Sequence, residues 1–248
     1  PAQTAVTVNL TYSGVAADGA DFTGVASVTI PANTSSANFS LATLQDSLAE
    51  GAESFTVTIA SAAGGNFESL VISAANGAAT TSITDDDTPA LSVSSPSVVE
   101  GGIAVFTVSL SNASTTAVTF TPSLASGTAS VGTDTATALE YFDGSTWQPA
   151  SGGVTIAAGA TSVQVRVATI DDVAADSGEQ FSLTATVTAG TTANASATGI
   201  ATITDDSDAV TVSLAATTPV AEGGNVVYTA TLGSPAVSAM TVTLSNGA

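Results

Sequence analysis

The side chains of this chain that could do chemistry are almost all carboxylates, and they recur in short groups. The pattern Asp-x3-[Asp/Glu]-x2-Glu-x-Phe occurs twice, beginning at Asp46 and at Asp172. Runs of adjacent aspartates begin at Asp85 and at Asp205. Carboxylates that are brought together without counter-ions repel one another. Oxygen ligands without nitrogen or sulfur suit Ca²⁺, which accepts roughly six to eight of them, better than transition metals, and Mg²⁺ keeps more of its water. The groups therefore favour a divalent cation, Ca²⁺ before Mg²⁺.

The composition excludes most other kinds of site. The 248 residues include 21 Asp plus Glu but one Lys plus Arg, no His and no Cys, so the formal net charge is −20. Without His or Cys there is no Ser-His-Asp or Cys-His nucleophile, no Cys/His zinc site, no haem or iron–sulfur ligation and no disulfide. The negative charge repels phosphates and anionic lipid, and no apolar run is long enough for a bilayer. We expect no nucleic-acid partner and no membrane insertion.

The acidic groups lie at fixed places in an internal repeat. Residues 28–46 align with 154–172 at a constant offset of 126, the Ile-Thr-Asp-Asp stretch recurs at an offset of 120, and Glu-Gly-Gly recurs at an offset of 122. All but four of the 21 acidic residues fall on these landmarks. The phase of the repeat predicts that the chain begins inside one module, contains a whole module and stops inside a third. We expect the three modules to span residues 1–88, 89–207 and 208–248.

Alternation with a period of two predicts strands that are buried on one face. Phe106, Val108 and Leu110 alternate with Thr107 and Ser109, and residues 163–167 and 181–185 follow the same rule. Short strands separated by Gly, Ser, Asn and Asp clusters, in modules near the length of an immunoglobulin domain, predict an all-β chain of antiparallel sandwiches. Only 5 % of the residues are aromatic, so each core is thin and its margin over chain entropy is modest.

The order of these motifs resembles the Calx-beta domain. Glu100-Gly-Gly is followed by Gly-Thr-Asp134, then Val-Thr-Ile at 154–156, Ile-Asp-Asp at 170–172 and Ile-Thr-Asp-Asp at 203–206. That family is known from regulatory domains of sodium/calcium exchangers and from repeats of large bacterial RTX and type I secreted surface adhesins. The resemblance implies tandem immunoglobulin-like (Calx-beta) modules, one complete and two partial. A complete module is then a sandwich of about seven strands that binds Ca²⁺ at the tip where its last strand leaves for the next module.

The resemblance also implies which carboxylates hold the ion. In the complete module they are Glu100, Asp134, Asp171, Asp172, Asp176, Asp205, Asp206 and Asp208. In the first module they are Asp21, Asp46, Glu50, Asp85, Asp86 and Asp87, and the corresponding residue of the third is Glu222. Gln45 replaces the first aspartate of the Asp-Asp pair in the first module, which also has no Glu-Gly-Gly, so that site is expected to be weaker or to borrow a ligand. Glu53 and Glu179 precede a core Phe by two residues, and we expect them to be buried and hydrogen-bonded rather than in contact with the ion.

Plainer interpretations of the same residues stay open. The aspartate runs can be turn or edge-protecting residues, and the Glu-Gly-Gly segments can mark a glycine bulge. A glycosidase pair at Asp171 and Asp172 is disfavoured because adjacent strand positions point to opposite faces. An Asp-Gly turn predicts a hairpin between Tyr141 and Trp147, which either covers the sandwich or contacts a glycan or a protein.

Together these observations predict a structural role without catalysis. The acidic end of the first module passes into the next strand with no flexible Gly/Ser spacer, so a cation there would join consecutive modules and limit bending. We expect an extender or fibre-forming repeat of an extracellular bacterial protein, at the cell surface or secreted, with a role in cell adhesion or a biofilm matrix. The alternative is a glycan- or protein-binding adhesin module that uses the loops around the Trp147 hairpin. The expected partners are adjacent modules of the same chain, or other copies joined head to tail by strand complementation.

Overall fold

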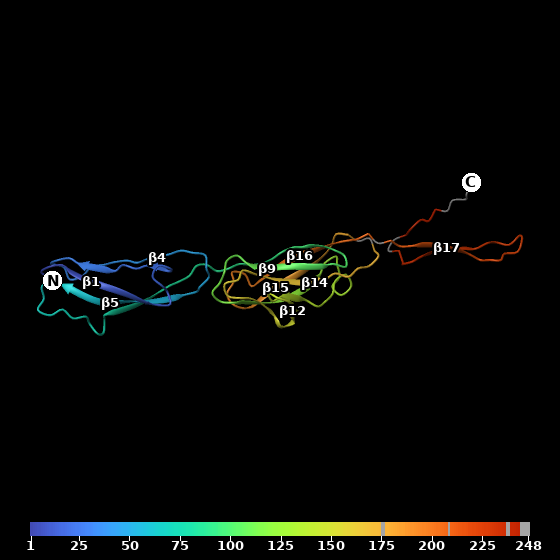
Figure 1. The fold of residues 1–248 in the computed structure, drawn as a ribbon. Helices are drawn as coiled ribbons and strands as arrows, with labels where there is room; N and C mark the ends of the chain where they lie inside the picture. The colour runs from blue at the N-terminus through green and yellow to red at the C-terminus, as the bar shows by residue number, and fades with distance from the viewer. Residues whose placement is uncertain (175–176, 208, 237–238, 244–248) are drawn as a thin grey trace.

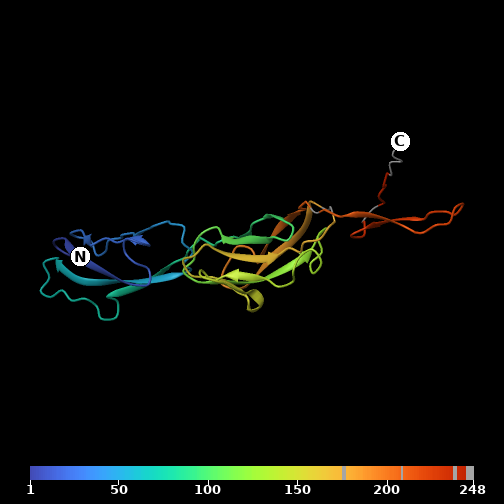
Figure 2. The ribbon, with the colours of Figure 1, turned by 45° about the vertical axis from the view of Figure 1, so that its right-hand side comes forward.

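A computed structural model describes residues 1–174, 177–207, 209–236 and 239–243 (Figure 1). Three groups of strands follow one another along a line in both views (Figures 1 and 2). The helical structure of the described part is a single 3₁₀ turn, η1 (Ala150–Gly152). None of the described residues forms a helix that is long and apolar enough to span a bilayer.

The first group is a four-stranded antiparallel sheet in the order β3-β1-β5-β6, with a short β2–β4 pair beside it. The strands are β1 (Val6–Gly14), β2 (Phe22–Thr23), β3 (Ser27–Ile30), β4 (Ala42–Thr43), β5 (Glu53–Gly64) and β6 (Ala78–Ile83). Phe22 of β2 stacks on Phe55 of β5, with ring centres 4.2 Å apart. The β2–β4 pair therefore covers one end of the inner face of the sheet, and no second sheet covers the rest in the described part of the chain.

The second group is a complete sandwich of two five-stranded sheets, in the orders β13-β10-β15-β16-β8 and β12-β11-β14-β9-β7. The strands are β7 (Leu91–Val93), β8 (Ser97–Val99), β9 (Ile103–Leu110), β10 (Val118–Ser126), β11 (Glu140–Phe142), β12 (Trp147–Pro149), β13 (Val154–Ile156), β14 (Ser162–Ala168), β15 (Glu179–Ala189) and β16 (Ser196–Thr204). The module has more strands than the resemblance implied, for two reasons. Its first strand is divided, because β7 pairs antiparallel with β9 while β8 pairs parallel with β16 in the other sheet. The predicted hairpin adds β11 and β12, which pair from Glu140 to Pro149.

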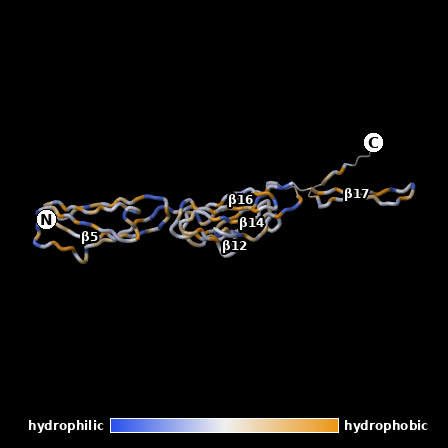
Figure 3. The backbone as a smooth tube through the Cα atoms, viewed as in Figure 1, coloured by the Kyte–Doolittle hydropathy of each residue, from blue (hydrophilic) through white to orange (hydrophobic). Residues whose placement is uncertain are grey.

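The core of the sandwich follows the alternation read from the sequence. Phe106 and Val108 of β9 are fully buried, whereas Ile103 at the start of the strand is exposed. Phe106 meets Phe181 of the facing sheet edge-on, at 5.9 Å between ring centres. Hydrophobic and hydrophilic residues alternate along the strands, and hydrophilic stretches lie where one group meets the next (Figure 3).

The third group is an antiparallel hairpin of β17 (Val212–Ala216) and β18 (Tyr228–Leu232). It pairs Val212 with Leu232, just as β7 and β9 pair Leu91 with Leu110. The hairpin lies beyond the sandwich, at the opposite end from the first sheet (Figure 1). The predicted fold class is confirmed: the protein is all-β, with one complete sandwich between two partial groups of strands.

Candidate metal centre

Four segments of the first group bring acidic side chains into one cleft of about 80 Å³. They are the turn before β2, the loop between β4 and β5, the first residue of β5 and the segment that follows β6. Glu53 begins β5 directly opposite Ile83, the last residue of β6, so the antiparallel register sets it beside the aspartate run. The acidic residues that line the cleft are Asp21, Asp46, Glu50, Glu53, Asp85, Asp86 and Asp87.

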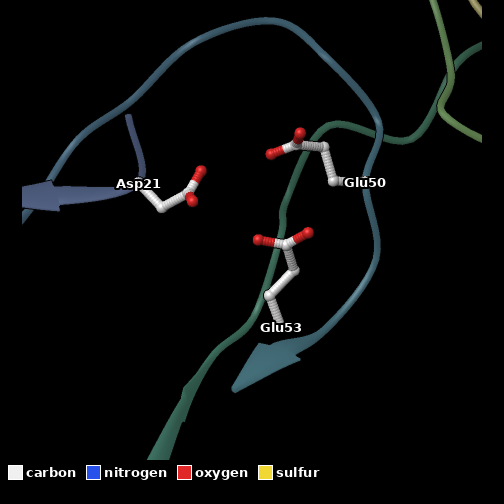
Figure 4. Close-up of side chains that lie close together, drawn as sticks. All are labelled: Asp21, Glu50 and Glu53. Carbon is white, nitrogen blue, oxygen red and sulfur yellow. The ribbon is translucent and has the colours of Figure 1, made fainter. Parts of the chain in front are cut away.

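Within the cleft the carboxylates form two groups of three. Asp21, Glu50 and Glu53 each offer an oxygen within 4.8 Å of the other two, and their side chains converge in Figure 4. The second group, residues 85–87, meets the same limit. The only basic side chain of the chain, Arg166, belongs to the sandwich and is bonded to Glu140 at 2.8 Å. No protein cation therefore neutralises the cleft.

Backbone N–H groups hold the carboxylate of Asp85 in place. Oδ2 of Asp85 accepts hydrogen bonds from the backbone N of Glu50 at 3.0 Å and of Gly51 at 3.2 Å, and its Oδ1 accepts one from Asp87 N at 3.2 Å. Gln45 Nε2 donates to Asp86 Oδ1 at 3.0 Å and to Asp87 Oδ2 at 3.2 Å. The amide that replaces the first aspartate of the pair is thus a neutral donor inside the cleft.

The pKa shifts show that the cleft holds uncompensated charge. Burial, and then repulsion from Glu53 and Asp21, raises the pKa of Glu50. Burial and the same repulsion from Asp21 and Asp85 raise the pKa of Glu53. Burial also acts on Asp85, but its backbone N–H donors outweigh it and lower the pKa of that carboxyl. A set of oxygen ligands whose ionised forms repel one another fits a bound divalent cation, which would relieve the repulsion.

The acidic residues of the sandwich that correspond to those of the cleft lie at one tip of the sandwich. Glu100 follows β8 and is 9 % exposed. Its backbone N donates to Thr204 O at 2.9 Å, next to Asp205, and its Oε1 accepts from Asp172 N at 3.2 Å. Asp134 joins them because its backbone O accepts from Ile170 N at 2.9 Å, one residue before Asp171. The described candidates at this tip are Glu100, Asp134, Asp171, Asp172, Asp205 and Asp206.

The same pair of hydrogen bonds holds Asp21 in the first group of strands and Asp134 in the sandwich. Oδ2 of Asp21 accepts from Ala17 N at 2.6 Å, and the backbone N of Asp21 donates to Ala17 O at 3.0 Å. Oδ2 of Asp134 accepts from Ser130 N at 2.5 Å, and its backbone N donates to Ser130 O at 2.9 Å. The repeat seen in the sequence is therefore a repeat of side-chain geometry.

The structure describes some of the remaining predicted ligands and not others. Asp206 Oδ1 is buried and has no hydrogen-bond partner within the described part of the chain, a state that fits a cation ligand. Asp176 and Asp208 lie outside the described residues. Apart from those two, no three carboxylates of the sandwich tip approach as closely as those of the cleft. Glu222 is exposed in a turn of the third group and belongs to neither group of three.

Glu53 is the cleft residue that reasoning from the sequence placed elsewhere. Because Glu53 shares a strand face with Phe55, we expected a buried position away from the ion. Glu53 is the first residue of the central strand β5, so it lies at the end of that strand, and its carboxylate reaches Asp21 and Glu50 (Figure 4). The signal that identifies it is its recurrence as Glu179, which pairs with Ile203 as Glu53 pairs with Ile83.

The cleft lies directly against the sandwich. Ala49, next to Glu50, bridges Ser114: Ala49 N donates to Ala113 O at 2.9 Å, and Thr115 N donates back to Ala49 O at 2.9 Å. At the other side of the cleft, Asn112 Nδ2 donates to the backbone O of Asp87 at 3.3 Å. The loop that carries Glu50 is therefore docked on the next module through backbone hydrogen bonds.

The Trp147 hairpin has its own internal contacts. The guanidinium of Arg166 lies 4.1 Å from the centre of the indole ring and also bonds Glu140. Backbone hydrogen bonds from Thr146 and Ser145 lower the pKa of Asp143 and close the turn. One face of the indole is thus covered from within, while a groove of about 530 Å³ opens beside Tyr141 and Phe142.

Comparison with protein families gives two matches that divide the chain between them. The model of the Calx-beta domain matches residues 84–208. The model of the LapA domain matches residues 1–86 and also residues 208–248. Both terminal segments therefore match one family, and the segment between them matches another. The module boundaries expected at 88 and 207 stay a prediction.

Comparison with solved structures gives distant matches. The apo form of the Calx CBD1 domain is 21 % identical over 47 % of this chain and 98 % of its own, with a TM-score of 0.35. The calcium binding domain CBD12 of CALX1.1 is 18 % identical over 77 % of this chain and 71 % of its own, with a TM-score of 0.32. Salmonella alpha-2-macroglobulin reacted with methylamine is 14 % identical over 77 % of this chain and 10 % of its own, with a TM-score of 0.29. No curated protein sequence matches the chain.

Proposed function

The chain belongs to the Calx-beta and LapA domain families, and from this premise we propose that it is an extender segment of an extracellular bacterial surface adhesin. Ca²⁺ bound at the ends of its modules keeps consecutive modules aligned. The protein acts as a spacer or fibre in cell adhesion or in a biofilm matrix, and it catalyses no reaction.

The observation that carries this proposal is the position of the acidic cleft at the junction between two modules. Glu50 contributes to the cleft, and its neighbour Ala49 is hydrogen-bonded to the sandwich. The aspartates after β6 line the same cleft and lead directly into the second module. An ion held here ties the docked loop to the end of β6, so it restrains the two segments whose relative motion would bend the junction.

The residues that would hold the ion are those of the two groups of three in the cleft. The cation supplies the positive charge that the cleft does not have. A site with a dissociation constant of ~0.1 mM in ~10 mM Ca²⁺ stabilises the folded state by about 2.7 kcal/mol. A site of that affinity is filled outside a cell and empty in the cytosol, so the ion also couples rigidity to export.

A second candidate function uses the groove beside the Trp147 hairpin. Its size and its Tyr141 and Phe142 lining suit a glycan or a loop of another surface protein. A glycan array tests it: hits that Trp147→Ala abolishes favour a binding module, and a blank array favours the spacer.

The spacer proposal is tested by thermal melting in Ca²⁺ and in chelator. We expect the ion to raise the melting temperature of the 248-residue chain by about 10 °C, since about 2.7 kcal/mol has roughly that effect on a module of this size. A shift of less than a degree or two, under conditions that saturate a millimolar site, contradicts the role of the metal. Mg²⁺ at the same concentration is the control for ionic strength and charge screening.

A further inference from the structure

The side chain of Gln45 bridges two carboxylates of the acidic cleft. Its Nε2 donates to Asp86 Oδ1 at 3.0 Å and to Asp87 Oδ2 at 3.2 Å. An amide NH₂ group has two hydrogens to donate, so these two contacts account for both of them. Gln45 is the only amide side chain among the residues that line the cleft. The amide nitrogen therefore stands between two negative side chains, where a cation would otherwise fit.

The internal repeat places different residues at both ends of this contact in the sandwich. At the offset of 126 Gln45 corresponds to Asp171, and at the offset of 120 Asp87 corresponds to Ser207. The amide and the third consecutive aspartate thus occur together in the first group of strands, where they are hydrogen-bonded to each other. In the sandwich, Ser207 separates Asp206 from the next aspartate, which lies outside the described residues. The amide is therefore matched to the aspartate that it contacts.

Repulsion between the aspartates gives the match its physical reason. Asp85, Asp86 and Asp87 offer oxygens that lie within 4.8 Å of one another. Ionised carboxylates at such distances oppose one another, and an aspartate at position 45 would add another negative charge beside them. The amide adds no charge, and its N–H groups form the stronger kind of hydrogen bond, the kind made to an ionised acceptor. Gln45 therefore reduces, without an ion, the repulsion within this group of three.

The other group of three in the cleft has no comparable donor at its two glutamates. Within the described part of the chain, no N–H or O–H group bonds the carboxylates of Glu50 and Glu53, which converge with Asp21 (Figure 4). A divalent cation is the charge that these side chains accept best, since they offer only oxygen. The demand for an ion is therefore greater on this side of the cleft than between Asp86 and Asp87.

We propose that Gln45 sets the number of Ca²⁺ ions in the cleft to one, because its amide takes the place of a second ion between Asp86 and Asp87. This inference rests on the proposed function, in which the cleft is a calcium site. The amide also holds the segment that leads into the sandwich, since Asn112 Nδ2 donates to the backbone O of Asp87 at 3.3 Å. That part of the joint is held by hydrogen bonds at any calcium concentration.

Isothermal titration calorimetry with Ca²⁺ on the 248-residue chain tests the proposal by the number of ions bound. We expect Gln45→Asp to bind one ion more than the unmodified chain, and ions bound elsewhere in the chain cancel in this difference. Gln45→Ala removes the amide without adding charge. It should also accept the additional ion, but roughly tenfold more weakly than Gln45→Asp, because it supplies no further ionic ligand. Gln45 is exposed, so neither substitution disturbs a core.

The matched control is Gln164→Asp, which places the same new charge on an exposed residue of β14, outside the cleft. It should bind as many ions as the unmodified chain. Equal numbers of ions in Gln45→Asp and the unmodified chain would overturn the inference and leave the calcium site itself in place. The inference also fails if Gln45→Ala binds the same number of ions more weakly, since the amide oxygen would then be a ligand. An unmodified chain that binds no Ca²⁺ would overturn the proposed function, and the inference with it.

Discussion

At the scale of residues, the cleft contains carboxylates whose pKa values are shifted in opposite directions. Asp85 has a lowered pKa because the N–H groups of Asp87, Gly51 and Glu50 outweigh its burial. Glu50 and Glu53 have raised pKa values because burial and their neighbours oppose their ionised forms. Backbone donors thus stabilise the ionised form of one carboxylate, whereas burial and repulsion disfavour the ionised forms of the other two.

These shifts predict a pH dependence for Glu50→Gln. A raised pKa in the folded state means that ionised Glu50 destabilises the fold at neutral pH, and that this penalty fades as the pH falls through the folded pKa towards the unfolded one. In chelator at pH 7, we therefore expect Glu50→Gln to have a higher free energy of unfolding than the unmodified chain, with the gap shrinking in acid. Urea denaturation at a series of pH values measures it.

The same substitution should act in the opposite direction when Ca²⁺ is present. Loss of a ligand reduces the stabilisation by the ion, so Glu50→Gln should gain less from Ca²⁺ than the unmodified chain. Glu68→Gln is the control, since Glu68 is exposed and lies outside the cleft. An equal response of Glu50→Gln and Glu68→Gln to the ion would show that the cleft is not a metal site.

At the scale of elements, the parts of the fold with strict alternation could be predicted from the sequence. The strands around Phe106, Val165 and Phe181 follow from the period of two, and the Asp143-Gly144 turn gave the hairpin. The division of the first strand between two sheets could not be predicted, because β7 and β8 have only three residues each, too few to show which sheet they join.

The sequence predicted which kind of candidate site to expect, but not all of the residues that line it. Oxygen ligands at the end of each module follow from the repeat. The position of Glu53 depends on the register of β5 against β6 and on where β5 begins, and alternation alone predicts neither. The docking of Ala49 on Ser114 was not predicted either, since small side chains joined through backbone hydrogen bonds have no sequence signature.

The core predicts a large loss of stability for Phe106→Ala. The side chain is fully buried and packs against Phe181, so its removal leaves a cavity in a core that has few aromatic residues. We expect the free energy of unfolding to fall by about 3–5 kcal/mol. Denaturant unfolding of the chain measures it. Val99→Ala is the control, because Val99 is exposed and should change the stability by less than about 0.5 kcal/mol.

The junction loop predicts a variant that loosens the joint without unfolding a module. Ala49→Pro removes the N–H that donates to Ala113, and we expect a cost in the range of a single hydrogen bond, about 0.5–1.5 kcal/mol. Spin labels on cysteines introduced at the exposed Ala60 and Ala189 report the spread of distances across the joint, and the chain has no cysteine of its own to interfere. The spread should widen for Ala49→Pro. It should not change for Ala74→Pro, which lies in the loop between β5 and β6 away from the joint.

At the scale of the whole molecule, the proposed ion should control the extension of the chain. Small-angle scattering in chelator should show a broader range of overall lengths than in Ca²⁺, because the emptied cleft no longer ties the loop before β5 to the segment after β6. The double variant Asp85→Asn with Asp87→Asn should resemble the chelated protein in both conditions. Identical scattering curves with and without Ca²⁺ would show that the backbone contacts alone align the two modules, without help from an ion.

The parallel pairing of β8 with β16 has a mechanical consequence. These strands stand near the entry and the exit of the sandwich, and they run in the same direction with Ser97 opposite Thr202 and Val99 opposite Thr204. Tension along the chain pulls the beginning of β8 and the end of β16 in opposite senses along their shared axis. Such a load shears the hydrogen bonds of the pair together instead of unzipping them singly, so we expect this short pair to resist extension of the module.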